Sequence, residues 1–220
     1  MQSLIDKRRL LLATALYSLT PLFAAEPDLL ARIGSQFEQY PVVRAEFVQS
    51  KQMAAMKRPL LTTGRLVYSR VHGVLWQIEK PFRLSYVLGA DKITEIGADG
   101  LRRERGLREV PGLAQVGRIL RAMLGANTTA LREYFDASVQ GDLNQWEITL
   151  KPRQPQLSQF LTGLRLSGSR FVEGISISEA GGDSTQIRFS HSQGSNALSE
   201  AELGIVGSYP APTSERPLKP

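Results

Sequence analysis

Hydrophobic and polar residues alternate with a period of two along most of the chain, most clearly over residues 64–81. This period predicts two β-strands joined by a turn over residues 70–73, because successive side chains of a strand point to opposite faces of a sheet. Pro81 ends the second strand, and a third alternating strand follows over residues 82–88. One face of these three strands is predicted to be broad and apolar. It carries Leu66, Tyr68, Val74, Trp76, Ile78, Leu84 and Tyr86.

The same alternation predicts further strands before and after this region. A strand from Arg44 to Met53 places Phe47 on an apolar face, and a loop follows it up to Leu61. Short strands are expected over residues 92–96 and 101–105. Strands resume after residue 136, and turns that contain glycine separate them. They are expected around residues 137–140, 146–151, 164–166, 171–177 and 187–189.

Helical spacing of apolar residues replaces this alternation in a few segments. Residues 28–40 carry one apolar stripe, and residues 113–124 carry another that includes Leu120 and Met123. A short helix is expected over residues 127–134, and a single helical turn over 156–160. Sequential turns favour antiparallel pairing, and a long antiparallel sheet tends to curl. The prediction is a single α+β domain, a curved, half-open antiparallel β-barrel of about eleven strands covered by a helical lid.

The N-terminal segment has the pattern of a secretory signal peptide. Lys7, Arg8 and Arg9 precede an apolar run from Leu10 to Leu19, and small residues follow at 24 and 25. An uncleaved anchor is the alternative, but a membrane span needs about 20 apolar residues and this run is shorter. We therefore expect a signal peptide over residues 1–25, one domain over 26–209 and a disordered, proline-rich tail over 210–220. The expected location is the periplasm.

Composition and charge limit the kinds of site and partner that the chain can have. The 220-residue chain has no cysteine, which excludes disulfides, thiol nucleophiles and thiolate metal sites. Its formal net charge is +6, and arginines crowd between Arg102 and Arg121. Such a run is either a solvated face or a surface for anionic lipid headgroups or an acidic partner. Nucleic acid is not expected as a partner of an exported protein.

The sequence contains no recognisable catalytic or metal-binding motif. Its two histidines, His72 and His191, fall in a turn and at a strand end. We expect neither an enzyme nor a cofactor, although an enzyme that uses only Ser, Asp and Lys stays open. The apolar sheet face is then either an ordinary filled core or the wall of a cavity for an acyl chain. The candidate lining is Phe47, Leu66, Tyr68, Trp76, Ile78, Leu84, Tyr86, Leu120 and Met123.

The order and spacing of several residues resemble the periplasmic lipoprotein carriers of the LolA type. The matching positions are Phe47-x-Gln49, Gly64-x-Leu66, Arg70, Trp76, Pro81 and the segment from Asp183 to Phe189. The resemblance implies an open eleven-stranded half-barrel with a helical lid. It also implies a soluble carrier that takes acylated lipoproteins from an inner-membrane transporter to an outer-membrane acceptor, and it gives Arg70 the role of a latch on the lid.

Two departures indicate a divergent branch of that family. Val71 stands where the family often has proline, and the stretch after Leu88 lacks a clear S-D-G-x-x-x-W-x-Y segment. The cargo could accordingly be a lipoprotein or another lipid, carried by a monomer. The alternatives are an envelope stress-sensing module that binds a partner protein on the same scaffold, or a lipid-modifying enzyme with a polar triad inside the barrel.

Overall fold

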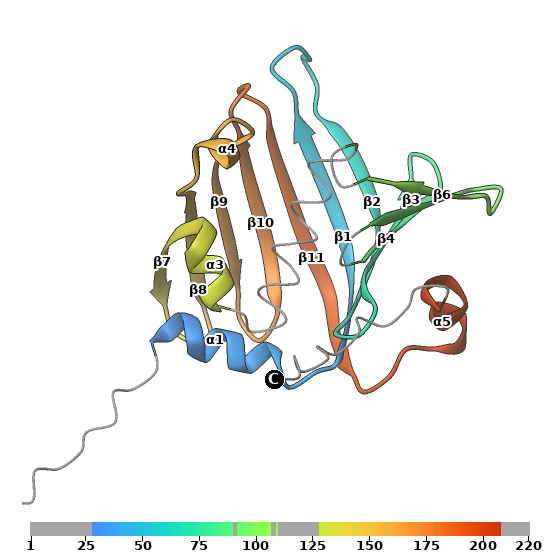
Figure 1. The fold of residues 1–220 in the computed structure, drawn as a ribbon, viewed down its shortest axis with the longest axis horizontal. Coiled ribbons are helices and arrows are strands. Elements are labelled where there is room, and N and C mark those ends of the chain that lie inside the picture. Colours follow the sequence, from blue (N-terminus) through green and yellow to red (C-terminus); the bar gives the residue numbers. More distant parts are fainter. Residues whose placement is uncertain (1–27, 90–91, 107–108, 110–127, 208–220) are drawn as a thin grey trace, which may run out of the picture.

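Eleven antiparallel strands form one curved sheet in the computed structural model, which describes residues 28–89, 92–106, 109 and 128–207 (Figure 1). The strand order is β6-β5-β4-β3-β2-β1-β11-β10-β9-β8-β7, so the chain starts at the centre, runs out to one edge and returns from the other. The strands are β1 (Val42–Gln52), β2 (Leu60–Ser69), β3 (Gly73–Lys80), β4 (Leu84–Leu88), β5 (Ile93–Gly97), β6 (Arg102–Arg105), β7 (Phe135–Gly141), β8 (Trp146–Pro152), β9 (Leu161–Gly168), β10 (Val172–Glu179) and β11 (Ser184–Ser195).

The register of the central strands follows the alternation of the sequence. Leu66 pairs with Trp76, and Tyr68 pairs with Val74, so that all four side chains lie on one face. Val67 lies on the opposite face. The predicted curved half-barrel with few helices is therefore confirmed, and the strands differ from the expected ones mainly by extending a few residues further at their ends.

Two helices cover what we call the inner face of the sheet, the face that carries Trp76. Helix α1 (Leu29–Phe37) begins after Asp28, whose Oδ1 accepts a hydrogen bond from the Ala31 N–H at 2.9 Å and caps the helix. Its apolar stripe of Leu30, Ile33 and Phe37 is buried against the sheet. Helix α3 (Thr128–Tyr134) lies beside β7 and buries Leu131 (Figure 1).

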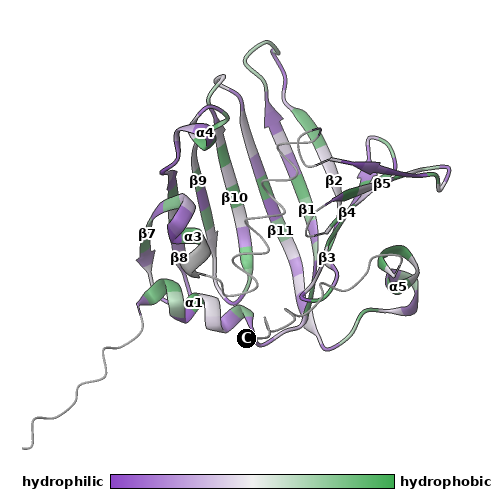
Figure 2. Ribbon diagram, viewed as in Figure 1, coloured by the Kyte–Doolittle hydropathy of each residue, from purple (hydrophilic) through white to green (hydrophobic). Residues whose placement is uncertain are grey.

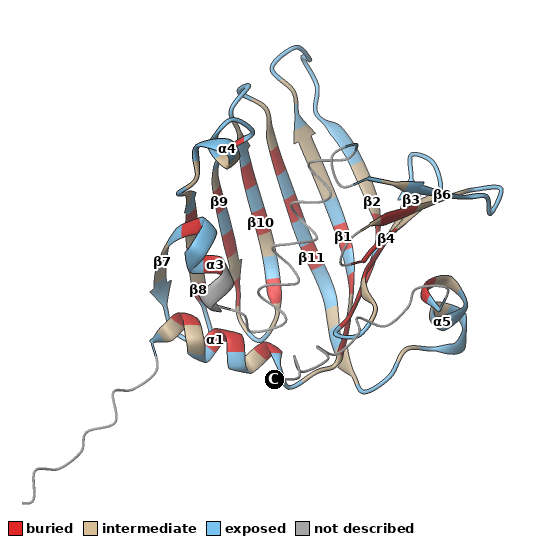
Figure 3. Cartoon of the chain, viewed as in Figure 1, coloured by how far each residue is buried: buried red, intermediate tan, exposed pale blue. Residues whose placement is uncertain are grey.

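A separate helix, α5 (Glu200–Val206), packs against the opposite, outer face of the sheet. Figure 3 shows α5 on the side of β3 and β4 that faces away from α1. Buried Val206 belongs to a second apolar cluster, which is distinct from the inner core. That cluster contains Val42, Val67, Leu75 and Val87, with Ile96, Leu198 and Ile205 packed against it. The sequence analysis did not predict α5. Helix α4 (Pro155–Ser158) is the expected single helical turn, at the other end of the strands.

Several expectations fall outside the described residues. They are the signal peptide over residues 1–25, the tail over 210–220 and the whole helical stripe over 113–124. In the arginine-rich stretch two of the described side chains have partners inside the chain. Arg102 donates to the carbonyl oxygens of Ile205 and Gly204 at 3.0 and 3.2 Å, and Arg105 pairs with Glu95. These two arginines therefore help to hold strands β5 and β6 and helix α5 together.

Candidate functional site

The candidate site is the inner face of the sheet, and most of the predicted lining residues lie there. Phe47, Leu66, Tyr68 and Trp76 are almost fully buried, while Ile78 and Tyr86 pack at the margin of the same core. The rings of Phe47 and Trp76 are stacked, with centroids 4.0 Å apart and planes tilted by 31°. Leu84 is half-buried opposite Ile78 in the pairing of β3 with β4. Leu120 and Met123 lie outside the described residues.

The described residues of the inner face are closely packed. They leave a small apolar pocket of about 20 Å³ between strands β1, β2, β10 and β11. A space of this size can hold a water molecule but not an acyl chain. An acyl chain could enter this region only if side chains of the covering helices moved away. The lining role of these residues stays a prediction.

Tyr86 stands at the margin of this face with a neutral hydroxyl. Burial raises the pKa of the phenol, and the negative charge of Glu95 raises it further. The ring therefore presents an uncharged edge beside the apolar surface at any physiological pH.

Arg70 links the sheet to the end of α1. Its Nη2 donates to the carbonyl oxygen of Glu38, the C-cap of α1, at 2.6 Å. Its backbone N–H donates to the carbonyl oxygen of Pro41 at 2.9 Å. A cation at this place also interacts favourably with the negative end of the helix dipole. The side chain is exposed, so water can compete for the Glu38 carbonyl.

The other end of α1 is tied to α3. The carboxylate of Asp28 forms an ion pair with the guanidinium of Arg132, and both side chains are about half exposed. Arg153 donates to the Arg132 carbonyl oxygen at 3.2 Å. Helix α1 is thus held over the inner face by its own apolar stripe and by solvent-exposed polar contacts at both ends.

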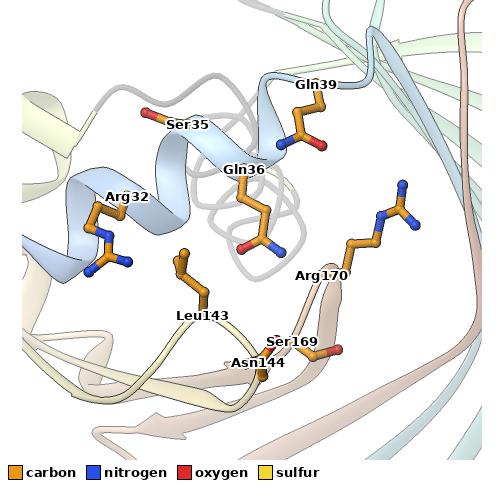
Figure 4. A pocket seen from close by; sticks show the side chains of 8 residues that line it. All are labelled: Arg32, Ser35, Gln36, Gln39, Leu143, Asn144, Ser169 and Arg170. Carbon is orange, nitrogen blue, oxygen red and sulfur yellow. The ribbon is translucent and has the colours of Figure 1, made fainter.

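A second feature, a polar pocket of about 810 Å³, was not predicted from the sequence (Figure 4). Gln36 points from α1 into it, and its Oε1 is buried without a hydrogen-bond partner among the described residues. The guanidinium of Arg170 lies 5.2 Å from the centre of the Tyr40 ring, a cation–π contact. The pocket lies between α1 and two turns of the sheet, and its lining is Arg32, Ser35, Gln36, Gln39, Leu143, Asn144, Ser169 and Arg170.

The histidines do not form catalytic constellations in the described part of the chain. The Nδ1 of His72 is buried and has no partner there. His191 is exposed, and its Nδ1 lies 3.2 Å from a carboxylate oxygen of Glu46. No group of three or more His, Asp or Glu side chains with metal-binding geometry occurs among the described residues.

Comparison with known proteins identifies the family. The profile of the outer membrane lipoprotein carrier protein LolA-like family matches residues 28–209, which is most of the chain. The chain belongs to this LolA-like family. A comparison with curated proteins finds no match. Within the described residues, no helix has the length and apolarity needed to cross a membrane.

Several solved structures match this chain at low sequence identity, with TM-scores below 0.5. A LolA superfamily protein from Nitrosomonas europaea is 7% identical, with a TM-score of 0.46, and the match covers 80% of this chain and 97% of that one. A DUF1329 family protein from Desulfovibrio piger is 12% identical, with a TM-score of 0.41 and coverages of 80% and 96%. A chain of the Pseudomonas aeruginosa MucA/MucB complex is 14% identical, with a TM-score of 0.44 and coverages of 80% and 59%.

Proposed function

We propose that this LolA-like protein is a periplasmic carrier that binds the acyl chains of a lipoprotein, or of another lipid, against the inner face of its sheet. The observation that carries the proposal is the way α1 closes that face. Its buried stripe fills the space with apolar side chains, while the polar ties at its two ends are exposed. Acyl chains would replace Leu30, Ile33 and Phe37 as the apolar filling when α1 moves aside.

The energetics of this exchange suit a carrier. Burying one methylene contributes about 0.8 kcal/mol, so a sixteen-carbon chain offers on the order of 12 kcal/mol before ordering costs. Part of that gain is offset by exposing the apolar stripe of α1 and by breaking the hydrogen bond from Arg70 to Glu38. The remaining affinity is lower than the burial alone would give, and this difference permits release to an acceptor.

The polar pocket could bind the polar part of the cargo. It lies beside α1, and Arg32, Gln36 and Arg170 offer hydrogen-bond donors to it. A headgroup or the first residues of a lipoprotein could lie there while the acyl chains occupy the apolar face. The partners proposed are a transporter in the inner membrane and an acceptor in the outer membrane.

The proposal can be tested with a fluorescently labelled triacylated peptide and the same peptide without acyl chains. We expect the protein to bind only the acylated form, measured by fluorescence anisotropy and by native mass spectrometry. Arg70→Leu should retain the peptide more tightly, because the closed state is less stable. Arg65→Leu, in strand β2 just before Arg70 but on the outer face beside Glu79, is the matched control.

Two results would count against a carrier. If neither the wild type nor Arg70→Leu binds the acylated peptide, the inner face is only a core and the stress-sensing alternative gains support. If both peptides bind equally, the polar pocket and not the apolar face recognises the ligand.

A further inference from the structure

Exposed hydrophobic side chains gather at the end of the strands opposite α1. Met56 in the β1–β2 loop is 40% exposed, Leu60 and Leu61 at the start of β2 are 46% and 61% exposed, and Phe160 after α4 is 62% exposed. We call these four residues the apolar tip. Figure 2 shows the β1–β2 hairpin projecting beyond the neighbouring strands, with hydrophobic residues at the start of β2. Such gathered exposure marks an interaction site more often than a chance feature.

The segments that carry the tip are joined to one another. The Ala54 N–H donates to Oδ1 of Asp183 at 2.8 Å, which ties the β1–β2 loop to the β10–β11 turn. The Ala180 N–H donates to the carbonyl oxygen of Phe160 at 3.2 Å, which ties that turn to the segment after α4. The loop, the turn and Phe160 therefore form one continuous rim.

The loop also has an ordered internal structure. Nε2 of Gln52 donates to the carbonyl oxygens of Met53 and Met56 at 3.2 and 2.9 Å, and the Met56 N–H donates to the Met53 carbonyl oxygen at 3.0 Å. These bonds hold the apolar side chains in an exposed position. A rim ordered in this way can bind without a large loss of conformational entropy.

The net charge around the tip is positive, because Lys51, Lys57 and Arg58 outnumber Glu179 and Asp183. Lys57 and Arg58 lie in the loop itself, are exposed and form no ion pair with any described residue. Of the two acidic residues of the rim, Glu179 pairs with Lys51 at 3.0 Å, while Asp183 accepts a hydrogen bond from the Ala54 N–H and keeps its negative charge. The tip thus combines large apolar side chains with two free cations.

We propose that the apolar tip docks on the surface of an anionic phospholipid membrane. Met56, Leu60, Leu61 and Phe160 enter the boundary between headgroups and acyl chains, and Lys57 and Arg58 bind the lipid phosphates. A surface with cations beside apolar side chains complements a negatively charged leaflet, where each cation contributes about a fivefold gain in binding. Four apolar side chains give weak, reversible docking. The inference rests on the tip alone and holds whether or not the protein carries acyl chains.

The first test is cosedimentation with vesicles of phosphatidylethanolamine and phosphatidylglycerol, against vesicles in which phosphatidylcholine replaces the anionic lipid. The wild type should bind only the anionic vesicles and should release as salt rises. Lys57→Gln with Arg58→Gln should weaken binding about 25-fold. The matched control, Arg103→Gln with Arg188→Gln, removes two exposed cations elsewhere and should change binding less than twofold. All variants carry the same N-terminus as the wild type.

The second test measures insertion directly. The chain has two tryptophans, Trp76 and Trp146, and both are buried, so a new surface tryptophan reports from its own position. Leu61→Trp should be quenched by lipids brominated on the acyl chains and should shift its emission to the blue. Leu203→Trp, on an exposed position of α5 that is 43% accessible, should show neither change.

Three results would overturn the proposal. They are equal binding to neutral and anionic vesicles, wild-type binding by the Lys57→Gln, Arg58→Gln variant, and no quenching of Leu61→Trp. Binding to native membrane vesicles that is lost after protease treatment, with no binding to pure lipid, would also overturn it, because the tip would then dock on a protein. Binding of the acylated peptide, measured on the same variants, reports separately on the carrier function.

Discussion

Two helices cover opposite faces of the same sheet, and they are attached in different ways. Helix α5 lies on the outer face, where Nε and Nη2 of Arg44 donate to the carboxylate of Glu202 at 2.7 and 2.6 Å. Ser199 and Glu202 also form a capping box at the start of this helix. Helix α1 lies on the inner face with exposed polar ties at its two ends, Arg70 to Glu38 and Asp28 to Arg132. Under the proposed carrier function, α5 is the cover that stays in place and α1 is the cover that moves.

The apolar contacts lead to a complementary conclusion. α1 buries Leu30, Ile33 and Phe37, whereas α5 buries Val206 alone as a fully covered side chain. Leaving the sheet is therefore costly for α1 in water, and the cost falls when another apolar molecule takes the place of its stripe. A cover of this kind would stay closed without cargo and open with it.

The largest expected effect is that of Phe37→Ala. The Phe37 ring is almost fully buried and meets Trp146 edge to face, with centroids 5.8 Å apart. We expect the free energy of unfolding to fall by about 3–5 kcal/mol, measured by urea denaturation. Val206→Ala in α5 is the comparison variant, with an expected loss of about 2 kcal/mol. A loss below about 1 kcal/mol for Phe37→Ala would mean that α1 detaches before the sheet unfolds.

Glu202→Gln tests the attachment of α5. The hydrogen bond from Arg44 and those from the Ser199 cap hold the pKa of Glu202 below its usual value. The ionised carboxylate therefore stabilises the fold above the unfolded-state pKa, and this contribution is lost as the pH falls through the folded-state pKa. At pH 7 we expect a loss of about 1.5–3 kcal/mol in the free energy of unfolding.

The pH dependence separates this interaction from a general effect of the substitution. The difference between wild type and Glu202→Gln should narrow in urea titrations below about pH 4.3, where Glu202 of the unfolded state begins to take up a proton, and should go on narrowing as the pH falls through the lower folded-state pKa. Glu200→Gln changes an exposed acid in the same first turn of α5 and serves as the control. An equal loss at pH 7 and pH 3 would show that the charge of Glu202 is not what holds the helix.

Alternation was enough to predict the sheet, because nearly every strand has one apolar face and one more polar face. The order Phe47, Leu66, Tyr68, Trp76 on one side follows directly from it. The helix α5 was missed because its signal is short. The pattern Ser199-x-x-Glu202 is typical of a capping box at the start of a helix. Only one buried apolar residue, Val206, follows it, so there is no apolar stripe to indicate the helix.

Contacts between residues far apart in the sequence could not be predicted from the local pattern. Arg44 and Glu202 are 158 residues apart, and nothing in the local pattern pairs them. The polar pocket likewise joins α1 to turns that carry Asn144 and Arg170. Local periodicity specifies which face a side chain takes, but not which remote segment covers that face. The latch role of Arg70 was predicted from the family resemblance, because the residues around Arg70 do not indicate it.

Arg70→Leu tests the tie at the C-terminal end of α1 with a smaller effect. The lost hydrogen bond joins a charged donor to an exposed carbonyl, so we expect about 1 kcal/mol. Hydrogen exchange of the backbone amides in residues 29–38 should become about fivefold faster, with little change in β8 or β9. Arg65→Leu is the control, because Arg65 pairs with Glu79 and does not contact α1. Unchanged exchange in α1 would contradict the latch.

The smallest effect is expected for Asp28→Asn, at the other end of α1. Asparagine caps a helix about as well as aspartate, so this change removes the ion pair with Arg132 and keeps the hydrogen bond to the Ala31 N–H. Because both partners are about half exposed, the free energy of unfolding should fall by no more than about 0.5 kcal/mol. Asp28→Ala removes the cap as well and should cost about 1 kcal/mol. If Asp28→Asn already costs as much as Asp28→Ala, the ion pair is the stronger tie and α1 is fixed at its start, so that any opening must begin at the Arg70 end.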